Sequence, residues 1–168
     1  MCQYCGCQQL TAIAELTREH DAVVALIRNV TEQVTAGRIA DAAATCRRIS
    51  DLLGPHSVVE EEGLFPELES EFPDQIAALT REHRQVERVL GEAAGGVPAD
   101  QSWPKRLQEV LVMLRSHILK EQDGVFPAAI ISLGSEQWQR VENARARASS
   151  LPHHPPLSEA SQDDRRAR

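Results

Sequence analysis

The sequence predicts an all-α protein: an antiparallel four-helix bundle with a short extra C-terminal helix and a disordered tail. Apolar residues recur at steps of three and four over four long segments, which is the period of one helix face. Glycine and proline separate these segments. The two halves of the chain also carry the same short motifs in the same order.

Composition limits the classes of function. The 168 residues fit one domain with a tail, and 18 basic against 25 acidic residues give a net charge of -7. No basic stripe is present to neutralise phosphates, so we expect no nucleic-acid partner. No apolar run approaches the roughly 20 residues that span a bilayer, and the first residues lack the pattern of a secretion signal. We therefore expect a soluble, cytoplasmic protein with no membrane contact.

We divide the chain into a cysteine-rich segment (1–9), the bundle domain (10–150) and a disordered tail (151–168). In the first predicted helix, His20 fills the missing step of an apolar series, and Gly37 ends the helix. The members of that series are Ile13, Leu16, Val23, Ile27, Val30 and Val34.

In the second predicted helix, Ile49 and Leu52 lead at the same spacing to His56 and then Glu60. The Gly-Pro pair at 54–55 precedes His56 directly. Proline removes a backbone hydrogen bond, so we expect a kink or a break here. Phe-Pro pairs at 65–66 and 126–127 are expected to end or bend their helices at equivalent places.

The third predicted helix follows the boundary at 71–74 and has His83 on its apolar face, and a loop at 95–100 separates it from the fourth. In the fourth helix, His117 and Glu121 continue the apolar series formed by Leu107, Val110 and Leu114. Residues Ser135 to Ala148 predict a short additional helix that contains Trp138.

Two motifs occur twice. LTREH stands at 16–20 and 79–83, and HxxxExxGxFP stands at 56–66 and 117–127. Residues four apart lie on one helix face, so each HxxxE pair presents an imidazole beside a carboxylate. Two such pairs, together with His20 and His83, predict a two-metal site.

A structural polar network is the alternative, because a single histidine on an apolar face is more often a core residue than a ligand. Burying four imidazoles and two carboxylates without compensation would cost several kcal/mol each. Metal ions would satisfy all six groups together. Imidazole with carboxylate favours iron, manganese or zinc over calcium and magnesium.

With this ordered set of residues, the chain resembles the hemerythrin-like, HHE cation-binding domain over about residues 10–133. The resemblance implies a four-helix bundle that holds two iron ions in an oxo- and carboxylate-bridged centre. Glu60 and Glu121 would be the bridges. The implied ligands are His20, His56, Glu60, His83, His117 and Glu121.

The chain departs from the oxygen-carrying members, which have HxxxH in the third helix and HxxxxD in the last. Here Glu87 and Gln122 occupy the two variable positions. This difference favours relatives with four histidines and two glutamates: iron and oxygen sensors, nitric-oxide-linked repair proteins and peroxide-consuming members. We expect binding of dioxygen, nitric oxide or hydrogen peroxide in a stress-response or sensing role. Peroxide-consuming, catalase-like turnover stays an open option.

Three further glutamates lie near the ligands in sequence. Glu87 is interpreted as either an extra ligand or a solvated charge beside Arg84, and the inward position of Val86 favours the second. Glu61 and Glu62 are expected at the surface or as partners that orient a ligand histidine.

Cys2, Cys5 and Cys7 form a second candidate site. They could bind a second metal or cluster with a fourth ligand from Cys46, His153, His154 or another subunit, or they could be redox-active or free thiols. Two alternative functions follow: an iron-centre repair or redox- and iron-sensing protein that uses this cluster, and a metal-stabilised interaction module.

Overall fold

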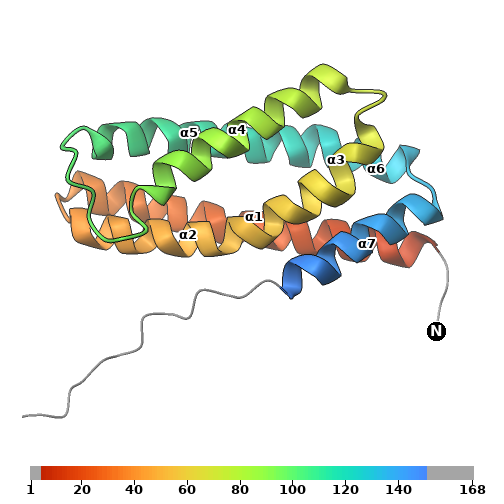
Figure 1. Ribbon diagram of the computed structural model, residues 1–168, viewed down its shortest axis with the longest axis horizontal. Coiled ribbons are helices and arrows are strands. Elements are labelled where there is room, and N and C mark those ends of the chain that lie inside the picture. Colours follow the sequence, from red (N-terminus) through yellow and green to blue (C-terminus); the bar gives the residue numbers. More distant parts are fainter. Residues whose placement is uncertain (1–4, 151–168) are drawn as a thin grey trace, which may run out of the picture.

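The computed structural model describes the backbone of residues 5–150 and the side chains of residues 11–150. The predicted all-α class is confirmed, since every regular element in this part of the chain is a helix. Figure 1 shows the long helices lying alongside one another. They are α1 (Cys5–Thr35), α2 (Ile39–Val59), α4 (Pro73–Gly91) and α5 (Trp103–Lys120). None of the described helices has the length and apolar character needed to cross a membrane.

Turns separate these helices near the predicted positions. Gly37 follows α1 with a φ of 72°, a conformation that glycine adopts without a steric penalty. Its N–H donates to the carbonyl of Val34. Pro73 begins α4, where a missing backbone donor costs nothing. Helix α1 begins at Cys5, so helical backbone extends into the cysteine-rich segment.

The predicted break at the Gly-Pro pair of 54–55 is wrong, because α2 continues through Pro55. The change in helix geometry comes later, at Glu60, where the π-helix η1 (Glu60–Leu64) begins before α3 (Phe65–Leu68). The N–H of Phe65 donates to the carbonyl of Glu60, five residues earlier. Pro66 lies in the first turn of α3, where its missing backbone donor costs little. The π-turn therefore separates the ligand pair from the proline.

The second half repeats this arrangement. The π-helix η2 (Glu121–Val125) precedes α6 (Phe126–Ser132), and the N–H of Phe126 donates to the carbonyl of Glu121. Both π-turns begin at a glutamate of an HxxxE pair. Single π-turns inside helices are frequent at functional sites, and here the repeated sequence places them at the same point twice.

The predicted additional helix is confirmed as α7 (Ser135–Ser149). It packs against α1, α2 and η1. Trp138 is fully buried. A Cβ on Gly63 would lie 2.9 Å from the Cβ of Ala144, so only glycine fits the close contact between η1 and α7. Helix α7 is therefore an integral part of the fold.

The apolar core consists of two clusters with the predicted ligands between them. In α1, Leu16 belongs to one cluster and Val23 to the other, with His20 in the middle. Leu79 and Val86 flank His83 in α4 in the same way. The polar layer thus crosses the bundle and is closed on both sides by apolar side chains.

Cys46 belongs to one of these apolar clusters and is fully buried. Ala12, near the start of α1, lies in the other cluster. Burial raises the pKa of the Cys46 thiol to about 12, which disfavours the thiolate that metals bind. The option that Cys46 completes a site with the N-terminal cysteines stays a prediction, because the side chains of those cysteines lie outside the described residues.

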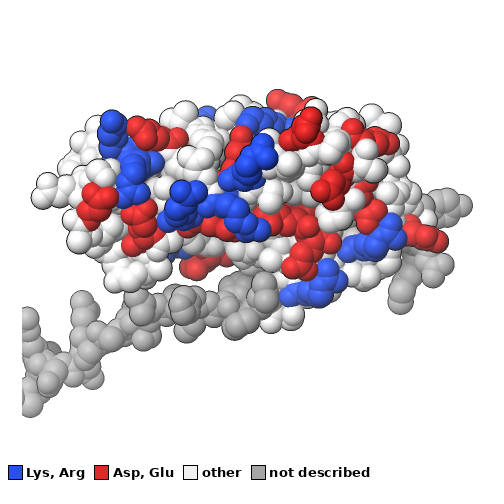
Figure 2. All heavy atoms as spheres, turned by 45° about the horizontal axis from the view of Figure 1, so that its top comes forward, with Lys and Arg blue, Asp and Glu red and all other residues white. Residues whose placement is uncertain are grey.

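Acidic and basic side chains are interspersed on the face shown in Figure 2. Several of the charged groups form ion pairs, as Arg106 does with Glu92 and Asp100. Arg140 of α7 pairs with Glu67 of α3. Basic groups on this face therefore stand next to acidic ones.

Candidate metal centre

The fold brings all six predicted ligands into one buried cluster. Each long helix supplies one histidine, and the two glutamates stand at the first residues of η1 and η2. The side chains form two groups of four that share both carboxylates and whose donor atoms lie within 4.8 Å of one another. One group is His20, His56, Glu60 and Glu121, and the other is Glu60, His83, His117 and Glu121.

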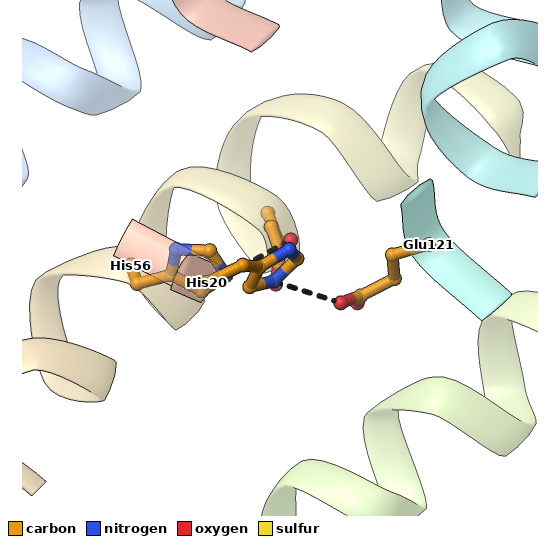
Figure 3. Close-up of side chains that lie close together, drawn as sticks. His20, His56 and Glu121 are labelled. Atoms are coloured by element: carbon orange, nitrogen blue, oxygen red, sulfur yellow. Dashed lines mark ion pairs between the residues drawn. The ribbon is translucent and has the colours of Figure 1, made fainter. Parts of the chain in front are cut away.

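Each carboxylate faces one histidine of its own motif and one from another helix. His56 Nε2 lies 3.1 Å from Glu60 Oε1, and His117 Nε2 lies 2.9 Å from Glu121 Oε1. Across the bundle, His20 Nε2 lies 3.2 Å from Glu121 Oε2 (Figure 3). Both glutamates are fully buried. They therefore lie between the two histidine pairs, where a bridging carboxylate would be placed.

The carboxylate oxygens lack hydrogen bonds. Both oxygens of Glu60 and both of Glu121 are buried without a hydrogen-bond partner among the described residues. A buried ionised carboxylate costs several kcal/mol unless a cation compensates it, and that cation is either a protonated histidine, since a histidine Nε2 lies 2.9–3.4 Å from each oxygen, or a metal ion. The four oxygens and the Nε2 atoms around them thus fit metal ions, which would satisfy all of these groups together.

The histidine tautomers are compatible with metal binding through Nε2. His83 and His117 each direct Nδ1 at a carboxylate, so Nδ1 carries the proton when the ring is neutral. Their Nε2 atoms then present lone pairs to one another at 2.9 Å. Two lone pairs at that distance repel, and the conflict is removed either by a proton on one Nε2, as the raised pKa of His83 implies for the metal-free centre, or by a metal ion. A metal ion bound through Nε2 removes the conflict and leaves both Nδ1 hydrogen bonds intact.

Three of the four histidines donate Nδ1–H to a glutamate. The Nδ1 atoms of His56, His83 and His117 lie 2.7, 2.8 and 2.9 Å from oxygens of their respective partners. Such partners fix the ring orientation and raise the basicity of a metal ligand. The partners, in the same order, are Glu19, Glu61 and Glu82.

A cation stands behind each of these glutamates. Arg145 of α7 donates to Glu19 at 2.6 Å, Arg84 pairs with Glu61, and Lys120 pairs with Glu82. Each of these carboxylates thus binds a cation on one side and accepts Nδ1–H on the other. The centre is therefore surrounded by three chains of the form cation, carboxylate, histidine.

The alternative roles of the nearby glutamates can now be assigned. Glu61 accepts the Nδ1 hydrogen bond of His83, a predicted ligand, as one of the alternatives expected. Glu62 is exposed and pairs with Arg147. Glu87 is also exposed and pairs with Arg84, which confirms the interpretation as a solvated charge. Neither of these two belongs to the metal-binding groups.

Glu19, Glu82 and Arg145 were not among the residues predicted to support the centre. Glu19 and Glu82 are the glutamates of the two LTREH motifs, and their repetition beside the histidines was a usable signal. Arg145 lies 126 residues from its partner Glu19, and no local pattern indicates that contact.

Aromatic rings stack on one histidine in each half. Phe126 lies nearly parallel to His20 with ring centroids 5.5 Å apart, and Phe65 stacks on His83 at 5.7 Å. These phenylalanines come from the two GxFP motifs. They close the cluster on the side of η1 and η2 and lower its exposure to water.

In the metal-free centre His56 and His83 hold protons strongly, because their pKa values are raised. Burial lowers the pKa of His56, but the charge of Glu60 and the hydrogen bond to Glu19 outweigh it and raise that pKa to about 10. For His83, burial is likewise outweighed by Glu60, Glu121 and Glu61, and the pKa rises to about 9. Burial raises the pKa of Glu60, and the histidines reverse this and hold it well below its usual value.

Metal loading at neutral pH is therefore expected to release protons. His56 and His83, with pKa values of about 10 and about 9, are protonated near neutrality and must lose a proton to bind metal through Nε2. The apparent affinity should rise with pH until these values are passed. Calorimetric titrations in buffers of different ionisation enthalpy measure the number released. A loading heat that is independent of the buffer would contradict the prediction.

The predicted cysteine site falls outside the described residues: the structure does not describe Cys2, or the side chains of Cys5 and Cys7. His153 and His154, and the predicted disordered tail at 151–168, also fall outside them.

Comparison with known proteins gives one match. Residues 11–129 match the family model described as the Hemerythrin HHE cation binding domain, which includes all six predicted ligands. No curated protein and no solved structure is similar enough to count as a match. Helix α7 follows the matched region, although its Arg145 reaches the centre through Glu19. The chain belongs to the hemerythrin family of HHE cation-binding domains.

Proposed function

We propose that this protein is a non-haem di-iron protein that binds dioxygen, nitric oxide or peroxide in a stress-response or sensing role. The observation that carries the proposal is the buried set of four histidines and two shared glutamates whose carboxylate oxygens have no hydrogen-bond partner among the described residues. The antiparallel order of the four long helices, which the sequence predicts, is part of this proposal.

The ligands divide into two positions. His20 and His56 would hold one ion, His83 and His117 the other, and both carboxylates would be shared. Two nitrogens and two oxygens per ion leave positions open on a metal that takes five or six ligands. Bound iron would supply redox chemistry and those open positions. The chain supplies the rest: it orients the imidazoles, supplies the negative charge and excludes water.

A pocket lined by residues that are near Glu121 and His83 in the chain would suit a small, uncharged ligand, although none of the six candidate ligands lines it. Its volume is about 460 Å³ and its wall is mostly apolar. Three of its lining residues are near candidate ligands in the chain. Lys120 directly precedes Glu121, Gly124 follows it by three residues, and Leu79 lies one helical turn before His83. Dioxygen and nitric oxide are small and apolar, so such a space would favour them over ions. The pocket lies between α4 and η2.

A second candidate is a metal-stabilised interaction module, which one observation favours. Arg145 links α7 to His56 through Glu19, so metal bound by His56 would help to fix α7. In this case the metal would hold the helices together without any exchange of small ligands. Iron-centre repair, or redox and iron sensing through the N-terminal thiols, remains the alternative that involves Cys2, Cys5 and Cys7.

The deciding experiment is metal analysis of anaerobically purified protein, with optical spectra before and after air, nitric oxide and peroxide. We expect two irons per chain and charge-transfer bands that change on exposure to at least one of the three. Steady consumption of peroxide would add catalase-like turnover to the binding function. Zinc in place of iron, or iron whose spectrum ignores all three reagents, would contradict the proposal and favour the interaction module.

A further inference from the structure

The two halves of the centre are related by an internal repeat, and one difference breaks it. His20 corresponds to His83 and His56 corresponds to His117. The corresponding histidines His56 and His117 have equivalent surroundings, since each donates Nδ1–H to the glutamate of an LTREH motif. The corresponding histidines His20 and His83 differ in this respect. His83 donates Nδ1–H to Glu61, whereas His20 Nδ1 is buried with no partner among the described residues.

The sequence explains the missing partner. Glu61 directly follows the glutamate of the first HxxxE pair, and the residue at the same place in the second half is Gln122. The cation behind Glu61 also has no counterpart. Arg84 directly follows His83, while Asp21 directly follows His20. His20 thus lacks both the carboxylate and the positive charge that support His83.

This difference changes the strength of a ligand. A carboxylate that accepts Nδ1–H makes the imidazole a stronger donor at Nε2 and holds the ring in place. Loss of such a partner typically lowers metal affinity by about 10- to 100-fold. His20 keeps its stack on Phe126 and its approach to Glu121, so its ring is positioned without a hydrogen bond at Nδ1.

We propose that the two metal positions are unequal, and that the position formed by His83 and His117 binds more tightly and fills first. The position formed by His20 and His56 is then the one that exchanges its ion. The cause is the pair Gln122 and Asp21, which stands where the other half has Glu61 and Arg84. This inference rests on the proposed two-metal function and adds an order of loading to it.

Two single-position variants measure the affinities separately, so cooperativity between the ions does not interfere. His20→Ala leaves the His83 position intact, and His83→Ala leaves the His20 position intact. Each apoprotein is titrated with Co²⁺ without oxygen against a competing chelator, and circular dichroism checks the helical fold. We expect H20A to bind one Co²⁺ at least about 10-fold more tightly than H83A does.

Exchanging the supporting residues tests the cause. In the H83A background, D21R together with Q122E copies the Glu61 and Arg84 arrangement and should raise the Co²⁺ affinity by about 10-fold. In the H20A background, E61Q should lower it by a similar factor. Equal affinities of H20A and H83A, tighter binding by H83A, or exchanges that change neither affinity would overturn the inference.

The wild-type chain gives an independent measurement if a variant fails to fold. At one equivalent of Co²⁺, the paramagnetically shifted Nδ1–H signals of His83 and His117 should appear before that of His56. Simultaneous appearance of all three, or that of His56 first, would overturn the unequal loading. Failure of the wild-type protein to bind Co²⁺ or Fe²⁺ at all would instead contradict the proposed function itself.

Discussion

Replacing Glu121 by glutamine is expected to reduce the metal content of the protein from two ions per chain to near zero. Glu121 belongs to both metal-binding groups, so the change removes a ligand from each position. Glutamine has nearly the same shape but no charge, and two positive ions would then share only Glu60. The loss of affinity should exceed the about 10- to 100-fold that follows changes to the partners of ligand histidines. Metal analysis after loading and gel filtration measures it.

The matched control is Glu87→Gln. This is the same substitution at a glutamate of α4. The Glu87 side chain is 46% exposed, pairs with Arg84 and does not belong to the metal-binding groups. We expect this variant to retain both ions. An E121Q protein that still holds two ions per chain would refute the assignment of Glu121 as a ligand. An E87Q protein that loses an ion would show that Glu87 belongs to the centre.

The six candidate ligands could be found from the sequence because each one stands where a helix should bury an apolar residue. A histidine there is ambiguous when it occurs once. His20 and His83 stand at equivalent places in two copies of one motif, and each HxxxE pair is also repeated. A polar side chain that interrupts an apolar series at the same point in both halves needs a common cause, and a shared metal centre supplies one.

The residues that hold the ligands could not be derived in the same way. Glu19 lies beside His20 in the chain but accepts its hydrogen bond from His56, 37 residues away on another helix. Arg145 acts from a helix that the repeat does not include. Such contacts depend on how helices pack across the bundle, and helix periodicity reports only which face is buried.

The π-turns were missed for a different reason. Apolar periodicity cannot separate an α-helix from an α-helix with one inserted residue, since the two patterns differ by a single step. Pro55 indicated a break, yet the neighbouring turns of α2 hold the helix through it. The departure at Glu60 depends on a hydrogen bond from Phe65 to a carbonyl five residues earlier. The repeated GxFP motif marked the place but not the geometry.

Removing the metal is expected to lower the thermal stability of the protein by roughly 20 °C. An ion present at about 1,000 times its dissociation constant stabilises the folded state by about 4 kcal/mol, and two ions contribute about twice that. For a chain of this size, 1 kcal/mol corresponds to about 2–4 °C in Tm. Calorimetry on metal-free and reloaded protein measures the difference, and an unchanged Tm would contradict a metal site in the core.

The pH dependence of that difference distinguishes the centre from an incidental surface site. In the metal-free protein, the raised pKa values of His56 and His83 stabilise the fold fully below the unfolded value of 6.5. This contribution is lost as the pH rises through about 9 and about 10. Bound metal keeps the same groups deprotonated at Nε2 throughout, so the stability of the loaded protein does not depend on these protons and does not fall with them as the pH rises. The gap in Tm should therefore widen from neutral pH toward pH 10, whereas a gap that stays constant would show that the metal does not displace these protons.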